Sequence, residues 1–138
     1  MIVPQINFAA VAVSGIASMA IGFLWYSPLL FGKTWMKLTG MTEKTMAQTK
    51  SKMGVTYGIS FVASLVMAYV LAHFIDLVSA TTVAEGIQVG ILAWLGFVAT
   101  TMITTVLFDN KPWKLYAINC GYQLASVLVM ATILVNWA

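Results

Sequence analysis

Charged residues are scarce in this chain of 138 residues, where they make up only 8% of the positions. Soluble domains carry roughly a quarter of charged residues, so this composition excludes an ordinary water-soluble domain. Hydrophobic residues reach 61%, and the mean hydropathy is +0.93. Cysteine is equally rare: the single Cys120 excludes a disulfide framework and a CxxC pair, and its ordinary role is that of a small buried apolar residue.

Apolar runs dominate instead, and four of them are long enough to cross a hydrocarbon core, which takes about 20 residues of helix. They are Ile6–Tyr26, Met53–Phe74, Ala84–Phe108 and Trp113–Trp137. We therefore expect an all-α protein, a four-helix transmembrane bundle in which residues 1–138 form a single transmembrane domain. No lysine or arginine precedes the first run, so the positive region of a signal peptide is missing and we expect this helix to be retained.

The middle of these runs lacks the charged residues that an ion-coupled transporter needs. Asp76, Glu85 and Asp109 fall at helix ends, and no lysine falls inside a run. This pattern disfavours proton-coupled antiport and excludes a retinal Schiff base. No GxSxG, HExxH, P-loop or dinucleotide motif occurs, so we expect no catalytic residue, no metal site and no cofactor. His73 could accept a proton or ligate haem, but a polar residue at the interface is the simpler interpretation.

Positive charge is confined to two segments, 33–52 and 111–114, which hold all seven lysines. The first connection has five lysines against one glutamate, a balance of +4, and the last has two lysines against one aspartate, a balance of +1. The middle connection has only two carboxylates, a balance of −2. Because positive residues are retained on the cytoplasmic side, we predict that both basic connections lie inside and both termini outside.

The chain between the first two runs is expected to lie at the membrane interface. Ser27-Pro28 should end the first helix, and apolar residues then alternate with lysines, as is typical of an interfacial segment. This interface segment comprises Trp25, Tyr26, Ser27, Pro28, Lys33, Trp35 and Lys37. Gly40 should break it, and Thr42-Glu43 predicts the capped start of a polar helix that runs on the cytoplasmic surface toward Lys52.

A weak internal repeat relates the second run to the fourth. At an offset of 63 residues, six positions match between Gly58 and Leu71. Chance would give about one or two matching positions between two sequences that are so rich in apolar residues. Both copies would cross the membrane in the same direction, which predicts two helical hairpins related by a pseudo-twofold axis along the membrane normal. The alternative, coincidental similarity between two apolar sequences, stays open.

Polar residues at membrane depth are the candidates for function, because each costs free energy unless it finds a partner or lines a wet cavity. The fourth run has the clearest set, a stripe in which Asn119 and Gln123 lie one turn apart. The Trp94 indole, near the middle of the third run, must find an acceptor such as Asn119, Gln123 or a serine. The candidate site comprises Tyr57, Ser60, Ser64, Trp94, Thr101, Asn119, Tyr122, Gln123 and Ser126. Such groups more often hydrogen-bond between helices, and a ligand site is the alternative.

Small residues recur every four positions at Ser14, Ser18 and Gly22, and again at Gly86 and Gly90. Such ladders let helix backbones approach closely, either within one chain or between chains. Four helices alone also bury few side chains fully. We therefore predict a homo-oligomer surrounded by the lipid bilayer, with a membrane protein as a further possible partner.

Four strings of residues in the chain form distinctive sequence motifs: Leu24–Met36, Tyr57–Phe61, Trp94–Phe97 with Thr100-Thr101, and Asn119–Gln123. Together they resemble the DUF1761 family, over nearly the whole chain. The first string, with WYSP, LLFGK and a following tryptophan, is the most specific because it fixes a helix stop, a glycine and a tryptophan. The resemblance implies a small, chiefly bacterial, multi-span membrane protein of no established activity, and it carries over no catalytic residues. The inner membrane of a bacterium is the expected location.

Two functions stay open on this evidence. In the first, a small oligomeric module binds or passes a neutral or weakly polar solute at the candidate site, since a site without buried charge suits such a ligand. In the second, the protein is a structural or accessory subunit whose polar stripe holds helices together and whose interface segment docks a partner protein or lipid. An enzyme acting on lipid is a remote third, because its base would have to be His73 or a carboxylate at a helix end. No nucleic-acid partner is expected.

Overall fold

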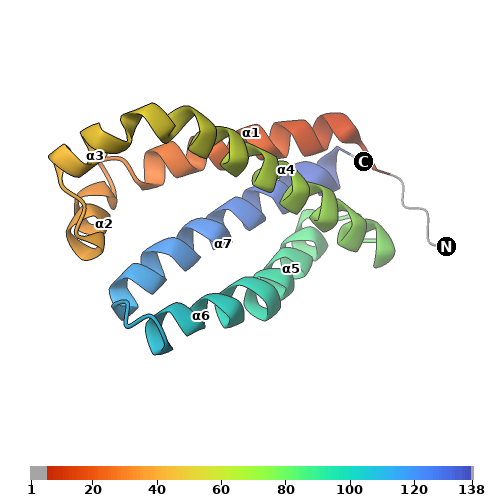
Figure 1. Ribbon diagram of the computed structural model, residues 1–138. Coiled ribbons are helices and arrows are strands. Elements are labelled where there is room, and N and C mark those ends of the chain that lie inside the picture. The colour runs from red at the N-terminus through yellow and green to blue at the C-terminus, as the bar shows by residue number, and fades with distance from the viewer. Residues whose placement is uncertain (1–5, 138) are drawn as a thin grey trace.

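Four long helices account for most of residues 6–137, the part of the chain that this computed structural model describes (Figure 1). The first, α1, spans Phe8–Trp25, and the fourth, α7, spans Trp113–Asn136. The second, Glu43–Leu77, joins α3 (Glu43–Thr49), the 3-10 turn η1 (Lys50–Lys52) and α4 (Met53–Leu77). The third, Val83–Leu107, joins α5 (Val83–Ala93), the π-helix η2 (Trp94–Ala99) and α6 (Thr100–Leu107).

Each of the four long helices is long and apolar enough to cross a membrane. No strand occurs among residues 6–137. The predicted class, an all-helical protein with four helices of membrane-spanning length, is confirmed. The predicted runs and the observed helices differ by at most a few residues at each end, apart from the second helix, which begins ten residues earlier than its apolar run because α3 leads into it.

The segment between α1 and α4 breaks where the sequence predicts. Gly40 ends α2 (Gly32–Thr39) with a left-handed φ of 74°, and Thr42 caps α3 by accepting a hydrogen bond from the Thr45 N–H (3.1 Å). Left-handed backbone favours glycine, and an N-cap threonine satisfies an N–H that has no partner inside the helix. The polar helix does not end at Lys52 as an element of its own, because η1 carries it straight into α4 as one 35-residue helix.

A tight turn follows α1 and explains one distinctive glycine. The Phe31 N–H donates to the Trp25 carbonyl (3.0 Å), and the Gly32 N–H donates to the Ser27 carbonyl (2.9 Å). A Cβ at Gly32 would clash with the backbone of Tyr26 and Ser27. The glycine in the LLFGK string is therefore required by the close approach of the chain to itself.

The central helix is α7, which contacts α1, α4 and the Val83–Leu107 helix. Four core residues have no exposed surface, and all lie in the half of the molecule that holds the start of α1 and the end of α7: Ala10, Ala68, Met130 and Ala131. At this terminal end the Asn7 amide donates to the Trp137 carbonyl (2.9 Å). The contact of α1, α4 and α7 is therefore densely packed and closed at this end.

The small-residue ladders pack against other helices of the same chain. Gly86 and Gly90 on α5 approach α7, where Val135 crowds Gly86 and Val127 lies 2.9 Å from the Cβ position of Gly90. On α1, Gly22 faces the Tyr122 ring of α7. Of the two roles that the sequence left open for the ladders, contact between helices of one chain is therefore the observed one.

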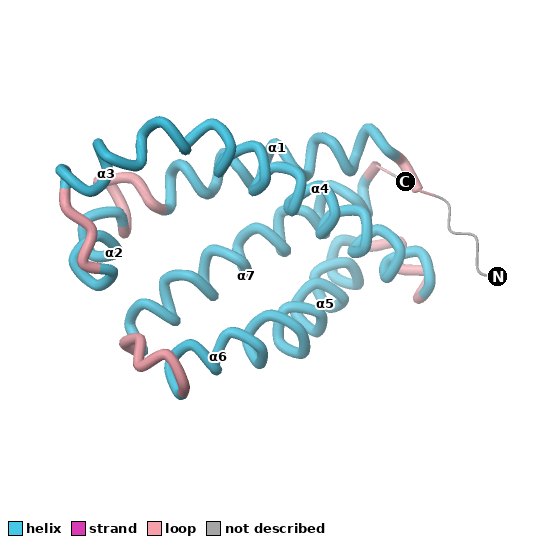
Figure 2. The backbone as a smooth tube through the Cα atoms, viewed as in Figure 1, coloured by secondary structure: helices cyan, strands magenta, loops and turns pink. Residues whose placement is uncertain are grey.

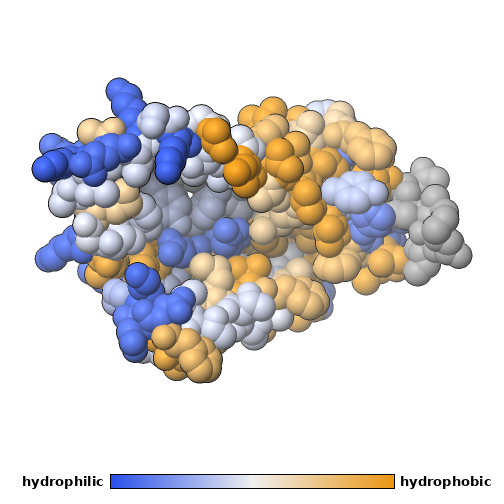
Figure 3. Space-filling model, in the orientation of Figure 1, coloured by the Kyte–Doolittle hydropathy of each residue, from blue (hydrophilic) through white to orange (hydrophobic). Residues whose placement is uncertain are grey.

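The long helices separate toward the opposite end, called the lysine end because both lysine-bearing connections lie there. Figures 1 and 2 show α3 and the start of α4 diverging from α6 and the start of α7, with α2 beside the opening. Residues 54–60 of α4 are all exposed. In the space-filling view, hydrophilic residues gather at this end and the surface is hollowed between the diverging helices (Figure 3).

The predicted internal repeat stays a prediction. Ala68 and Ala131, which it equates, both have no exposed surface. Gly58 and Gly121, which it also equates, differ: Gly58 faces open space, whereas Gly121 packs against the Trp25 ring. The chain ends predicted to face outward, residues 1–5 and 138, lie outside the described residues.

Candidate functional site

Ser18 on α1 is the centre of a hydroxyl cluster that joins three of the long helices. Its Oγ donates to Ser126 Oγ on α7 (3.2 Å) and accepts from Ser64 Oγ on α4 (3.5 Å). The Tyr122 hydroxyl lies 3.3 Å from the same oxygen and donates to the Ser18 carbonyl (3.1 Å). Three predicted site residues therefore meet, and they meet at a residue that the sequence assigned only to a packing ladder.

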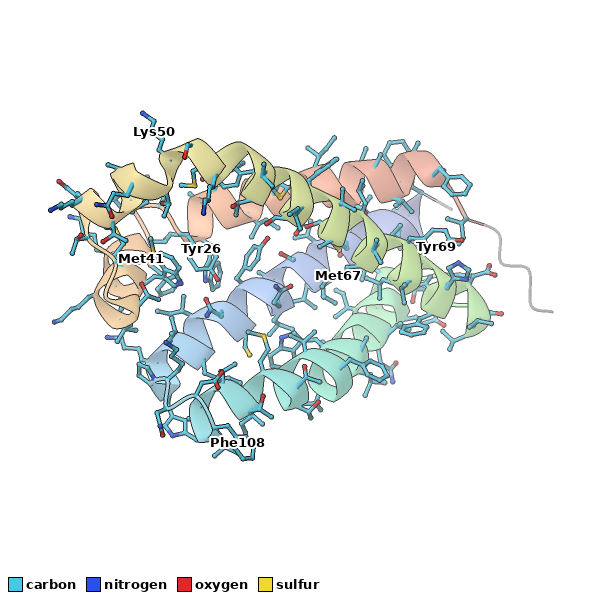
Figure 4. All side chains as sticks on the ribbon, in the orientation of Figure 1. Tyr26, Met41, Lys50, Met67, Tyr69 and Phe108 are labelled. Atoms are coloured by element: carbon cyan, nitrogen blue, oxygen red, sulfur yellow. The ribbon has the colours of Figure 1, made fainter. Side chains whose placement is uncertain are left out.

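Asn119 takes part in a second contact between α1 and α7. The Tyr26 hydroxyl donates to Asn119 Oδ1 (2.7 Å), and the Trp25 indole N–H donates to the Ile118 carbonyl (2.9 Å). Figure 4 shows Tyr26 at the end of α1, reaching toward α7. Trp25 and Tyr26 were assigned to the interface segment from their position, and the structure adds that both fasten the end of α1 to α7.

Trp94 lies on a different side of α7 from this cluster. Its indole N–H donates to the Cys120 carbonyl (2.9 Å), so the predicted partners, Asn119, Gln123 or a serine, are wrong. The indole lies in the π-helix η2, which packs against α7 near that carbonyl. The same contact includes a hydrogen bond from the Tyr116 hydroxyl to the Ala99 carbonyl at the end of η2 (2.7 Å).

Gln123 is half-buried, and its side chain has no hydrogen-bond partner among residues 6–137. It lies one helical turn after Asn119 and one turn before Val127 on the same face of α7. Asn119 contacts Tyr26, and Val127 lines a groove beside α4. Along α7, Gln123 therefore lies between these two features.

Three further predicted site residues also lie outside the cluster. Thr101 is exposed, and its hydroxyl donates back to the Phe97 carbonyl of its own helix (2.7 Å), a common way for threonine to satisfy itself. Tyr57 is 41% exposed and meets the Phe23 ring edge-on at 5.2 Å. Ser60 is exposed on α4. The candidate site thus resolves into a bonded cluster, an unpaired amide and outlying groups.

An apolar groove of about 290 Å³ runs between α4 and the α5–η2 helix, with Met67, Trp94 and Val127 among its lining residues. A second hollow of about 290 Å³ continues it toward the terminal end, lined there by Leu77 and Val89. Phe74 lines both. The sequence gave no signal for this groove, since its residues are the apolar ones that any lipid-facing helix carries.

His73 is a separate feature near the terminal end of α4. Its ring packs edge-on against Tyr69 with centroids 4.5 Å apart, and Nε2 is buried without a hydrogen-bond partner in the described part of the chain. Within residues 6–137, no group of three His, Cys, Asp or Glu side chains is placed to hold a metal ion. His73 is therefore isolated from the polar groups on α7.

The fold and the site together define a class: a small helical membrane protein whose polar groups lie between its apolar helices and carry no charge. Within this class the chain belongs to the DUF1761 family, whose model matches residues 9–135 and is described as a protein of unknown function. A search of curated proteins found no match, and neither did a search of solved structures. The resemblance seen in the sequence is confirmed, and the function has to be argued from the site.

Proposed function

We propose that this protein binds a neutral solute through the side-chain amide of Gln123. The amide has no partner among the described residues, whereas Asn119, one turn away, is bonded to Tyr26. An amide left unpaired at membrane depth costs on the order of 1–3 kcal/mol, so a solute that pairs with it stabilises the protein. This unpaired amide is the observation that carries the proposal.

The solute is expected to be uncharged. The lysines lie within 33–52 and 111–114, and the four carboxylates lie at positions 43, 76, 85 and 109, at helix ends. A charged solute at the depth of Gln123 would have no nearby counter-charge, and desolvating it would be costly. A hydroxyl, carbonyl or amide group can instead pair with the donor and the acceptor of one glutamine side chain.

Access from the lysine end supports binding on one side of the membrane. The helices diverge there and the surface is hollowed (Figure 3), while Ala10, Ala68 and Met130 fill the terminal end with no exposed surface. A solute that reaches Gln123 from the lysine end would meet this core beyond it. The arrangement suits a binding protein, or one state of a carrier whose terminal end opens in another state.

Orientation, location and assembly belong to the same proposal. With the lysine end in the cytoplasm, as the charge balance favours, the site faces the cytoplasm from the inner membrane of a bacterium. Self-association remains part of the proposal, but the ladders that suggested it pack within the chain. Gly54 and Gly58 on α4 face open space and are the glycines of that helix still free for a second chain to approach.

A structural or accessory role is the second candidate, and the Ser18 cluster favours it. Ser18, Ser64 and Ser126 bond three helices to one another, and Tyr26 with Asn119 adds a further bond. A polar stripe holds membrane helices together through hydrogen bonds of this kind between helices. In this function the segment from Trp25 to Lys52 would dock a partner protein or lipid.

Two single substitutions separate the candidates, because the structure gives the two amides different partners. Gln123→Leu removes an unpaired amide, so it should abolish a retained non-lipid solute in native mass spectrometry from nanodiscs without lowering the stability of the solute-free protein. Asn119→Leu removes the acceptor of Tyr26, so it should lower stability. Val129→Leu, on the exposed side of α7, is the matched control. A solute-free wild type, with Gln123→Leu indistinguishable from the control, would reject binding and favour the structural role.

A further inference from the structure

The apolar groove between α4 and the α5–η2 helix begins at Ala63 and Val127, one helical turn from Gln123, and hydrophobic side chains line it throughout. We propose that this groove holds the hydrocarbon chain of an amphiphile whose neutral head group hydrogen-bonds to Gln123. The inference rests on the proposed function and adds the class of ligand. Such a ligand reaches the site laterally from the bilayer, whereas a purely polar solute would come from water.

Two polar residues on two helices lie one helical turn from the inner end of the groove. Val127, which lines that end, is one turn after Gln123, about 6 Å along α7. Ala63 lines it from α4, and Ser60, one turn earlier on the same face, is exposed and has no partner in the described part of the chain. A glutamine and a serine therefore lie within one helical turn of the residues at which a chain in the groove would end. A hydroxyl or carbonyl head group could pair with either.

The length of the groove suits one hydrocarbon chain. Its lining on α4 extends from Ala63 to Val78 at the terminal end, about 22 Å along the helix axis. Phe74 and Phe97 line both parts and approach each other at 6.4 Å between ring centroids. The Trp94 N–H is already bonded to Cys120, so the indole offers the groove only its apolar ring.

A bilayer phospholipid does not satisfy Gln123, although its chains could enter the groove. Gln123 is ten residues from Trp113 at the start of α7, which places the amide about 15 Å from the lysine end of the helix. A phospholipid head group remains at the interface, and a phosphate brought to this depth would lie among uncharged groups. The occupant is therefore a molecule with a neutral head, one that is stable near the middle of the membrane.

Photocrosslinking with matched probes tests this directly. The full chain is reconstituted in phosphatidylethanolamine and phosphatidylglycerol nanodiscs and irradiated with a C16 alcohol that carries a diazirine at mid-chain, or with the same alkane without the hydroxyl. We expect the alcohol to label groove peptides about fivefold more than the alkane, the ratio that one hydrogen bond of ~1 kcal/mol gives. Equal labelling by both probes would overturn the proposal.

Two variants test separately where the head group and the hydrocarbon chain of the ligand bind. Gln123→Leu should reduce alcohol labelling to the alkane level. Ala63→Phe, which fills the inner end of the groove from an exposed position, should reduce labelling by both probes, and Ala12→Phe on the exposed side of α1 is its matched control. If Ala63→Phe changes nothing while Gln123→Leu abolishes the alcohol preference, the groove is rejected and the proposed function stands. If Gln123→Leu changes nothing, both are rejected.

Discussion

Replacing Ser18 by alanine should destabilise the protein by about 1–2 kcal/mol, because it removes the hub of the hydroxyl cluster. The substitution deletes the hydrogen bonds to Ser126 (3.2 Å) and from Ser64 (3.5 Å), and the contact with the Tyr122 hydroxyl (3.3 Å). Hydrogen bonds between helices in membranes contribute ~0.6 kcal/mol on average, and up to ~1.7. Tyr122 keeps its bond to the Ser18 carbonyl, so the loss corresponds to two or three average bonds.

Reversible unfolding in bicelles measures this effect. A loss of 1–2 kcal/mol lowers the ratio of folded to unfolded protein by about 5- to 30-fold. Ser60→Ala is the matched control, since Ser60 lies on α4 like Ser64 but is exposed and has no partner among the described residues. If Ser18→Ala is no less stable than Ser60→Ala in the absence of ligand, the hydroxyl cluster does not hold the helices together and the reasoning fails.

Three further predictions concern the helix contacts. Tyr26→Phe should cost about 1 kcal/mol by leaving Asn119 without its donor, and the same unfolding assay measures this; no loss would mean that the bond is not formed in a membrane. Gly90→Leu should cost about 1–3 kcal/mol or prevent folding, because α5 lies close to α7 there, while Gly58→Leu should be tolerated in open space; equal behaviour of the two variants would contradict the helix arrangement. Thr42→Ala should cost about 1 kcal/mol through the lost cap of α3, read as reduced hydrogen-exchange protection of the first turn; unchanged protection would contradict the cap.

The spans and local breaks could be predicted from the sequence because each depends on nearby residues. An apolar run of sufficient length has few alternatives to a membrane helix, since every backbone polar group must be satisfied within it. Gly40 and Thr42 act through their own backbone and side-chain geometry. These features do not depend on which helix packs against which.

The partners of the polar groups could not be predicted, because they depend on how each helix is rotated about its axis. Trp94 was expected to bond a polar side chain, yet it finds the carbonyl of Cys120 on another side of α7. The widened turns of η2 lie close to that carbonyl, and nothing in the sequence of Trp94–Ala99 predicts a π-helix. Ser18 and Gln123 show the same limit. The sequence identified both as polar or small, but not that one would be shared by three side chains and the other left unpaired.

The most direct test of the central claim is the accessibility of position 123 from each side of the membrane. Gln123→Cys is made in a Cys120→Ala background, since Cys120 is the only native cysteine, and is treated with a membrane-impermeant thiol reagent in vesicles of known orientation. The account predicts modification from the lysine end alone, with Met130→Cys in the closed core unreactive from both sides. Modification from the terminal end, or none from either side, would contradict a polar site that opens toward the lysine end.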